Sequence, residues 1–119
     1  MTRKQWKTKI KKACNNAGTY NKSFDIAIDT LSGILETRDK AQEKFEAAGS
    51  EPIVKHTNKA GATNIVKNPA LQVIEACNIQ ALAYFRDLGL TAKGLKSIGV
   101  EVEKKEESSF EKLFADLGI

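Results

Sequence analysis

The side chains that most often perform catalysis are few in this chain and lie far apart in its sequence. His56 is the only histidine, and Cys14 and Cys77 are the only cysteines. Zinc sites need several such ligands at short paired spacings, and this sequence has none. Two lone cysteines on helix faces indicate reduced, buried residues instead. We therefore predict no metal site.

Two other patterns suggest enzyme chemistry only at first sight. The stretch from Lys59 to Thr63 has some likeness to a phosphate-binding loop, but it lacks the Gly-Lys-Ser/Thr order and a preceding buried strand. The acidic neighbours Asp25 with Asp29 and Glu106 with Glu107 are typical of solvated surfaces. The sequence therefore predicts no catalytic residue and no cofactor, which means that the chain is not an enzyme by itself.

Basic side chains are concentrated at the start of the chain. Residues 1–22 carry seven basic residues and no acid, whereas residues 101–119 carry six acids and three lysines; the net charge is +4. A basic segment of this kind favours a polyanion, and nucleic acid first of all. Lysines along one helical stripe can follow phosphates without reading bases. The predicted DNA-binding residues are Arg3, Lys4, Lys7, Lys9, Lys11 and Lys12 near the N-terminus, and Lys55, Lys59 and Lys67 in the central loop.

Two helices are predicted in the first half. One runs from Thr2 to about Ala17, with an apolar side that contains Trp6 and a lysine-rich side opposite. The second runs from Ser23 to about Ala48 with apolar residues at near-heptad spacing, and a helix this long needs a long partner. We expect its seam to mediate self-association. The predicted oligomerisation residues are Phe24, Leu31, Ile34 and Phe45.

The central loop and the third helix come next. Residues 50–67 allow either a small β-hairpin or an irregular loop. Asn68 can cap a helix that has Pro69 at its first position, and Gly89 suits a left-handed C-cap. The apolar face of this helix is predicted to contain Leu71, Ile74, Cys77, Ala81, Phe85 and Leu88.

A short helix at residues 91–98 is predicted after Gly89. A helix-turn-helix over residues 81–99 is an alternative interpretation, but Phe85 lies where that motif needs a small residue. We therefore expect Leu90, Leu95 and Ile98 to pack on the end of the third helix rather than to support base reading.

The last segment is a charged stretch followed by a capping box at Ser108 and an amphipathic helix. We expect this helix to be tethered and to bind a partner, with folding back onto its own core as the alternative. The predicted partner-binding residues are Phe110, Leu113, Phe114 and Leu117. The predicted domains are residues 1–99, for DNA binding and oligomerisation, and residues 100–119, for the acidic linker and this helix.

Two short motifs also carry a resemblance. The Asn-Pro-Ala-Leu sequence at residues 68–71 and the Leu-Gly-Leu-Thr sequence at residues 88–91 resemble those of small subunits of tailed-bacteriophage terminases. The resemblance implies a protein that binds double-stranded viral DNA for genome packaging in the host bacterial cytoplasm. It also implies a ring, and a separate large terminase subunit whose ATPase and nuclease this chain regulates.

Together these features predict an all-α protein built on a long helical hairpin with a basic N-terminal helix, and the resemblance implies that it forms a ring-shaped oligomer. The chain is 41% apolar and 29% charged, and no apolar run approaches the length of a membrane span. Two alternatives remain: a small dimeric DNA-binding regulator or nucleoid-type protein, and a helical adaptor without a nucleic-acid role.

Overall fold

The computed structural model describes residues 1–91 and 109–117. Its elements are the helices α1 (Arg3–Ala17), α2 (Asp25–Ala47), α3 (Pro69–Asp87) and α5 (Ser109–Leu117), the 3-10 turn η1 (Lys22–Phe24), and the strands β1 (Ile53–Thr57) and β2 (Thr63–Lys67). The predicted helix at residues 91–98, the helix-turn-helix that depends on it and the charged stretch after residue 99 lie largely or wholly outside the described residues.

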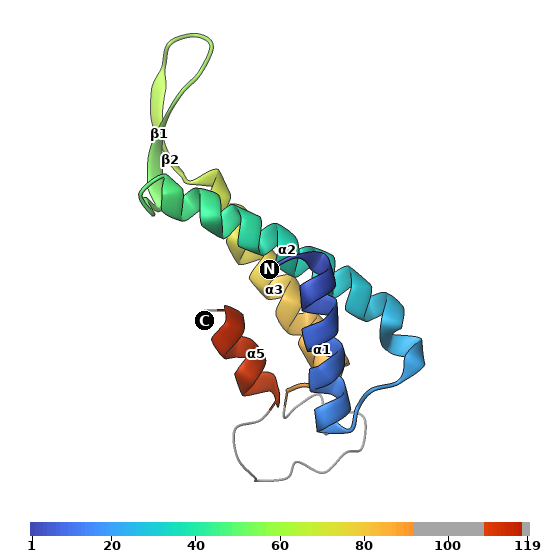
Figure 1. Ribbon diagram of the computed structural model, residues 1–119. Helices are drawn as coiled ribbons and strands as arrows, with labels where there is room; N and C mark the ends of the chain where they lie inside the picture. The colour runs from blue at the N-terminus through green and yellow to red at the C-terminus, as the bar shows by residue number, and fades with distance from the viewer. Residues whose placement is uncertain (92–108, 118–119) are drawn as a thin grey trace.

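Helices α2 and α3 form the long antiparallel hairpin that the sequence predicted (Figure 1). Helix α3 begins where expected, because the Asn68 side chain accepts a hydrogen bond of 3.0 Å from the backbone N–H of Ala70, and Pro69 follows as the first helical residue. It ends at Asp87, and Gly89 two residues later has a φ of 73°, in the left-handed region that glycine adopts without strain. Both boundaries of α3 are thereby confirmed.

Helix α1 packs beside the first half of α2. A capping box fixes its start: the Thr2 hydroxyl accepts a hydrogen bond from the backbone of Gln5, whose side chain accepts one from the backbone of Thr2. The left-handed Gly18 ends it. The apolar side of α1, with Trp6, Ile10 and Cys14 fully buried, then lies against α2 and α3.

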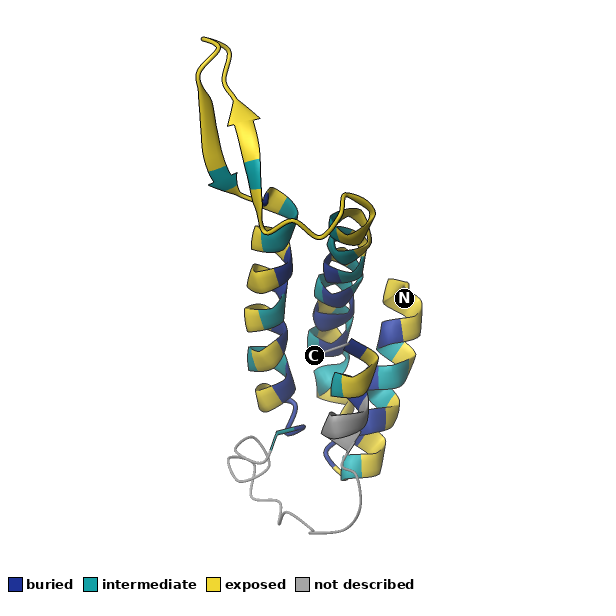
Figure 2. Ribbon diagram, turned by 90° about the vertical axis from the view of Figure 1, so that its left-hand side faces the viewer, coloured by how far each residue is buried: buried dark blue, intermediate teal, exposed yellow. Residues whose placement is uncertain are grey.

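The central loop is a β-hairpin, which resolves the open choice between a hairpin and an irregular loop. The strands pair antiparallel in a register that sets Val54 opposite Val66 and Lys55 opposite Ile65. At the tip, the Asn58 side chain accepts hydrogen bonds of 3.0 Å from two backbone N–H groups of the turn. The hairpin extends beyond the end of the helical hairpin and is largely exposed (Figures 1 and 2). The protein is thus mainly helical with one small sheet.

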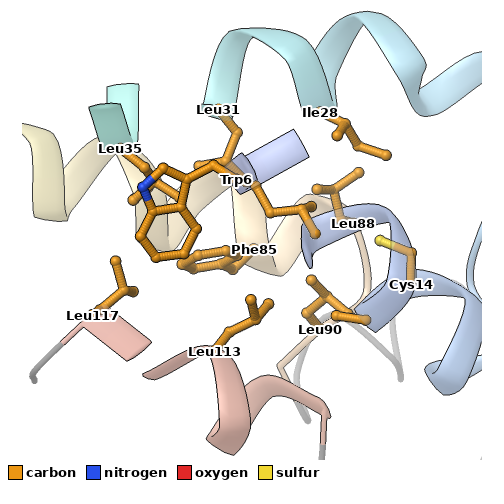
Figure 3. Close-up of a cluster of buried hydrophobic side chains, with 13 residues drawn as sticks. Trp6, Cys14, Ile28, Leu31, Leu35, Phe85, Leu88, Leu90, Leu113 and Leu117 are labelled. Atoms are coloured by element: carbon orange, nitrogen blue, oxygen red, sulfur yellow. The ribbon is translucent and has the colours of Figure 1, made fainter. Parts of the chain in front are cut away.

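The apolar core joins the four helices that the structure describes, and this corrects the predicted seam of α2. Figure 3 shows Leu31 among Trp6, Phe85 and their neighbours, and its side chain is 0% exposed. Phe24 and Ile34 are partly buried against the same cluster. Leu31 is therefore covered within one chain by α1 and α3, and the expectation that it lies on an uncovered surface was wrong. The periodicity of α2 showed an apolar face but not what covers it.

Helix α5 is also packed rather than merely tethered, contrary to the first expectation. Leu113 and Leu117 are each 3% exposed and lie in the core beside Phe85 (Figure 3). The ring of Phe114 is tilted against that of Phe85, with 6.3 Å between centroids. Asp116 makes an ion pair with Lys9 of α1. Helix α5 is therefore part of the core of this chain.

This packing predicts a measurable cost when α5 loses a core side chain. Replacing Leu113 with alanine should lower the free energy of unfolding by about 2–5 kcal/mol, because a buried leucine loses its transfer energy and leaves a cavity. Urea unfolding followed by circular dichroism measures this value. The matched control is Ala115→Gly on the exposed side of the same helix, which should cost only about 1 kcal/mol. Equal effects of the two changes would mean that α5 is not part of the core.

Candidate nucleic-acid interface

The predicted basic residues of α1 divide into two groups in the structure. Arg3, Lys7 and Lys11 form one stripe with a spacing of four residues, and this stripe faces carboxylates of α2. Arg3 lies 2.9 Å from Asp29, Lys7 lies 3.8 Å from the same residue, and Lys11 lies 3.9 Å from Asp25. These cations have acids as neighbours, so they contribute less to attracting a polyanion than their number suggests.

Lys11 is tied further into the junction between α1 and α2. Its Nζ lies 5.2 Å from the centre of the Tyr20 ring, and the Tyr20 hydroxyl donates a hydrogen bond of 2.9 Å to Asp25. The interaction with Tyr20 and then the charge of Asp25 raise the pKa of Lys11 above its ordinary value. We therefore infer that the main role of Lys11 is structural, at the junction between α1 and α2.

Lys4 and Lys12 make up the other group on α1. They lie one turn on either side of Thr8, both are exposed, and neither makes an ion pair within residues 1–91 and 109–117. A cavity of about 380 Å³ at the Lys4 end is lined by Met1, Lys4, Gln5, Thr8 and Lys9. Lys9 at its edge is paired with Asp116. The available charge of α1 therefore lies along the Lys4–Lys12 stripe.

The β-hairpin presents the second basic group. Residues 52–74 contain no acid, and the strands and turn carry Lys55, His56 and Lys59, all exposed. Lys67, at the base of the hairpin, makes an ion pair with Glu75 of α3. Lys55 and Lys59 therefore form the available charge of the hairpin, and they stand away from the acids of the helices.

The two groups do not merge into one patch. Helix α1 lies along α2 between Asp39 and Asp25, as the ion pairs of the preceding Met1 amino group with Asp39 and of Lys11 with Asp25 show, whereas the hairpin follows the opposite end of α2 (Figure 1). The molecule extends 58 Å along its longest axis, which exceeds one turn of duplex DNA of about 34 Å. One molecule therefore presents two separate basic surfaces.

An acidic surface on α2 was missed by the sequence analysis. A cavity of about 480 Å³ is lined by the acids Glu36, Asp39, Glu43 and Glu46 of α2 and Asp116 of α5, and also by Lys40 and the N-terminal Met1. The α2 members recur at three or four residues, a spacing that could have revealed a common face. The backbone N–H of Arg3 donates a hydrogen bond of 2.7 Å to Glu36 and lowers the pKa of that carboxyl. With five acids and few cations, this face is not expected to attract a polyanion.

The remaining chemistry of the described residues is structural. Cys14 and Cys77 are buried free thiols, and burial raises the pKa of both above its ordinary value, so they stay protonated at neutral pH. Among residues 1–91 and 109–117, no group of three or more potential ligands is placed to hold a metal ion. In the same part of the chain, no helix has the length and apolar character to cross a bilayer.

Comparison with known proteins identifies the family. Residues 2–105 match the family described as phage terminase, small subunit. This match covers most of the chain, so the protein belongs to that family, as the motifs at residues 68–71 and 88–91 had suggested. Searches of curated proteins and of solved structures gave no match. Family membership places the chain in bacteriophage genome packaging.

Proposed function

We propose that this protein binds double-stranded viral DNA through two basic surfaces and regulates the ATPase and nuclease of the large terminase subunit. The residues that bind DNA are Lys4 and Lys12 on α1, and Lys55 and Lys59 on the β-hairpin. The observation that carries the proposal is the hairpin itself, an exposed arm without acids on a family member whose role is genome packaging. The work takes place in the cytoplasm of the infected bacterium.

The arrangement favours binding to phosphates rather than to bases. Lysines are flexible point charges, and the four proposed side chains come from one exposed helix face and one narrow hairpin. Each helix within the described residues packs against the core, and none projects from it as a helix inserted into the major groove would. Binding should therefore depend strongly on salt and weakly on sequence.

The partner and assembly roles are also proposals. The large subunit is the proposed partner of α5, but Leu113 and Leu117 are buried within this chain, so that binding through them requires α5 to leave the core. Assembly into a ring stays a prediction. Leu31 is buried within a single chain and cannot contact a neighbouring subunit. The subunits of a ring would therefore have to contact one another through surfaces other than the complete apolar seam predicted on α2.

Changing Lys55 and Lys59 together to alanine tests the role of the hairpin. The double variant should bind all DNA sequences more weakly by a similar factor. The slope of log K against log salt should shrink by about 0.9 for each phosphate that the variant no longer neutralises. Fluorescence anisotropy with two unrelated duplexes measures both quantities.

The control for this test is Lys40→Ala. Lys40 is another exposed lysine, with 71% side-chain exposure, but it lies beside Glu36 on the acidic surface of α2. Its removal should leave DNA affinity nearly unchanged. If the hairpin variant binds as tightly as the wild type while the protein remains folded, the hairpin does not bind DNA.

A further inference from the structure

The β-hairpin is joined to the helices only at its base (Figure 1). The chain enters it through residues 48–52 after α2 and leaves it through Asn68 before α3. Among the described residues, Lys67 with Glu75 is the one side-chain hydrogen bond or ion pair between the two strands and a helix, and both partners are about half exposed, so that it contributes little. A projecting hairpin held this weakly needs another contact at its base to keep one direction.

Asn68 provides that contact. It is 9% exposed, and each of its four polar groups makes a hydrogen bond. Its side-chain oxygen accepts a bond of 3.0 Å from the backbone N–H of Ala70, and its side-chain nitrogen donates one of 2.9 Å to the carbonyl of Glu51. Its backbone N–H donates one of 2.8 Å to the carbonyl of Pro52, and its own carbonyl accepts one of 3.2 Å from Gln72. Asn68 therefore connects the chain that enters the hairpin to the first turn of α3.

We propose that Asn68 is a positioning residue, which fixes the direction of the β-hairpin and thereby holds Lys55 and Lys59 in place for DNA. The positioning of these two lysines rests on the proposed function, whereas the direction of the hairpin does not. The two parts therefore have separate tests.

Capping of α3 does not by itself require asparagine. A cap needs only an oxygen that accepts a hydrogen bond from the first turn, and serine or aspartate provides one equally well. Asparagine also carries an N–H donor in the same planar group, and at position 68 this donor binds the carbonyl of Glu51 across the junction. A hydrogen bond that is shielded from water is stronger than an exposed one. The side-chain donor is therefore the part of Asn68 that acts on the hairpin rather than on the helix.

A fixed direction matters for DNA binding because a mobile hairpin must become ordered when it binds. Ordering costs free energy, which lowers the affinity without changing the contacts that are finally made. The number of neutralised phosphates, in contrast, sets the slope of log K against log salt. Loss of the Asn68 donor should therefore weaken binding and leave this slope unchanged, whereas loss of Lys55 and Lys59 weakens binding and makes the slope shallower.

The first test measures the motion of the hairpin. Ala60 is exposed at its tip, so that Ala60→Cys provides a thiol for a fluorophore on a short linker. At neutral pH this thiol reacts first, because Cys14 and Cys77 are buried and protonated. Time-resolved fluorescence anisotropy then separates motion of the hairpin from tumbling of the whole protein. With Asn68 present the label should follow the whole protein, and Asn68→Ser should add a faster motion of the hairpin.

Two further variants separate this role from capping and from the chemistry of the substitution. Asn68→Asp keeps a cap whose charge also suits the N-terminus of α3, but it has no proton to donate to Glu51. It should leave α3 as stable as in the wild type and still make the hairpin mobile. Asn64→Ser makes the same exchange as Asn68→Ser at an exposed position of β2 and should not change the motion. Circular dichroism verifies that each variant is folded.

The second test measures the affinity of the unlabelled proteins for duplex DNA. Asn68→Ser should bind about three- to tenfold more weakly than the wild type, with the same slope of log K against log salt. Asn64→Ser should bind like the wild type.

The proposal is overturned if the label moves in the same way in folded Asn68→Ser as in the protein with Asn68, because the hairpin then keeps its direction without the donor. The part that concerns DNA is overturned if the hairpin becomes mobile but the affinity does not fall. A wild type that binds no duplex would refute the proposed function instead, and the anisotropy decay would still decide whether Asn68 fixes the hairpin.

Discussion

Replacing Leu31 with aspartate is expected to prevent the chain from folding. Leu31 is 0% exposed and lies in the core that joins α1, α2, α3 and α5. The described side chains of this core are apolar, so a carboxylate there would be buried among them without a charge to pair with, which costs more than about 4 kcal/mol, a large part of the 5–15 kcal/mol that stabilises a typical domain. Far-UV circular dichroism should therefore show that cooperative unfolding has disappeared.

The control for this substitution lies on the same helix. Ile26 is 83% exposed, so Ile26→Asp introduces the same charge into α2 without burying it and should change stability by only about 0.5 kcal/mol. If Leu31→Asp instead remained folded and only lowered the mass of an oligomer, Leu31 would lie at a subunit interface and the described core would be incorrect.

Changing Lys4, Lys12, Lys55 and Lys59 together to alanine is expected to remove most DNA binding. Each neutralised phosphate contributes about 0.9 to the slope of log K against log salt, which at about 0.1 M salt corresponds to nearly tenfold in affinity. Without these four lysines, binding should be weaker by a factor on the order of 10³. Filter binding or anisotropy at fixed salt measures this effect on any duplex.

A second quadruple variant tests whether DNA affinity depends on the positions of the basic residues or only on their number. Its residues each make an ion pair with a carboxylate in the structure: Arg3, Lys7, Lys9 and Lys67. Changing these to alanine alters the net charge by the same amount, yet the affinity should fall much less. Equal reductions in affinity for the two quadruple variants would mean that only net charge matters and that the four proposed lysines have no special role.

Much of the fold could be predicted because local chemistry determines it. Asn68 and Pro69 start α3, and Gly89 ends it, through hydrogen bonds and backbone angles that involve only neighbouring residues. The same is true of Gly18 at the end of α1. The apolar face of α3 was also predicted correctly, since its spacing matches the helical period.

The parts that could not be predicted depend on packing between distant segments. Periodicity showed that α2 has an apolar face, but not that α1 and α3 of the same chain cover Leu31. In the same way, a count of basic residues in α1 could not reveal that Arg3 and Lys7 face Asp29, because residues far apart in sequence come together only in the fold. The packing of α5 on the core was predicted only as the alternative for the same reason.

In the proposed function, this small terminase subunit holds DNA through a few exposed lysines that bind phosphates. The most direct test is the affinity of the wild-type protein for a duplex of arbitrary sequence, measured between about 50 and 200 mM salt. Four neutralised phosphates per subunit predict a slope of log K against log salt of about −3.6, with little change between duplexes of different sequence. A flat salt dependence, or no binding at the lowest salt, would mean that these lysines do not hold DNA through its phosphates.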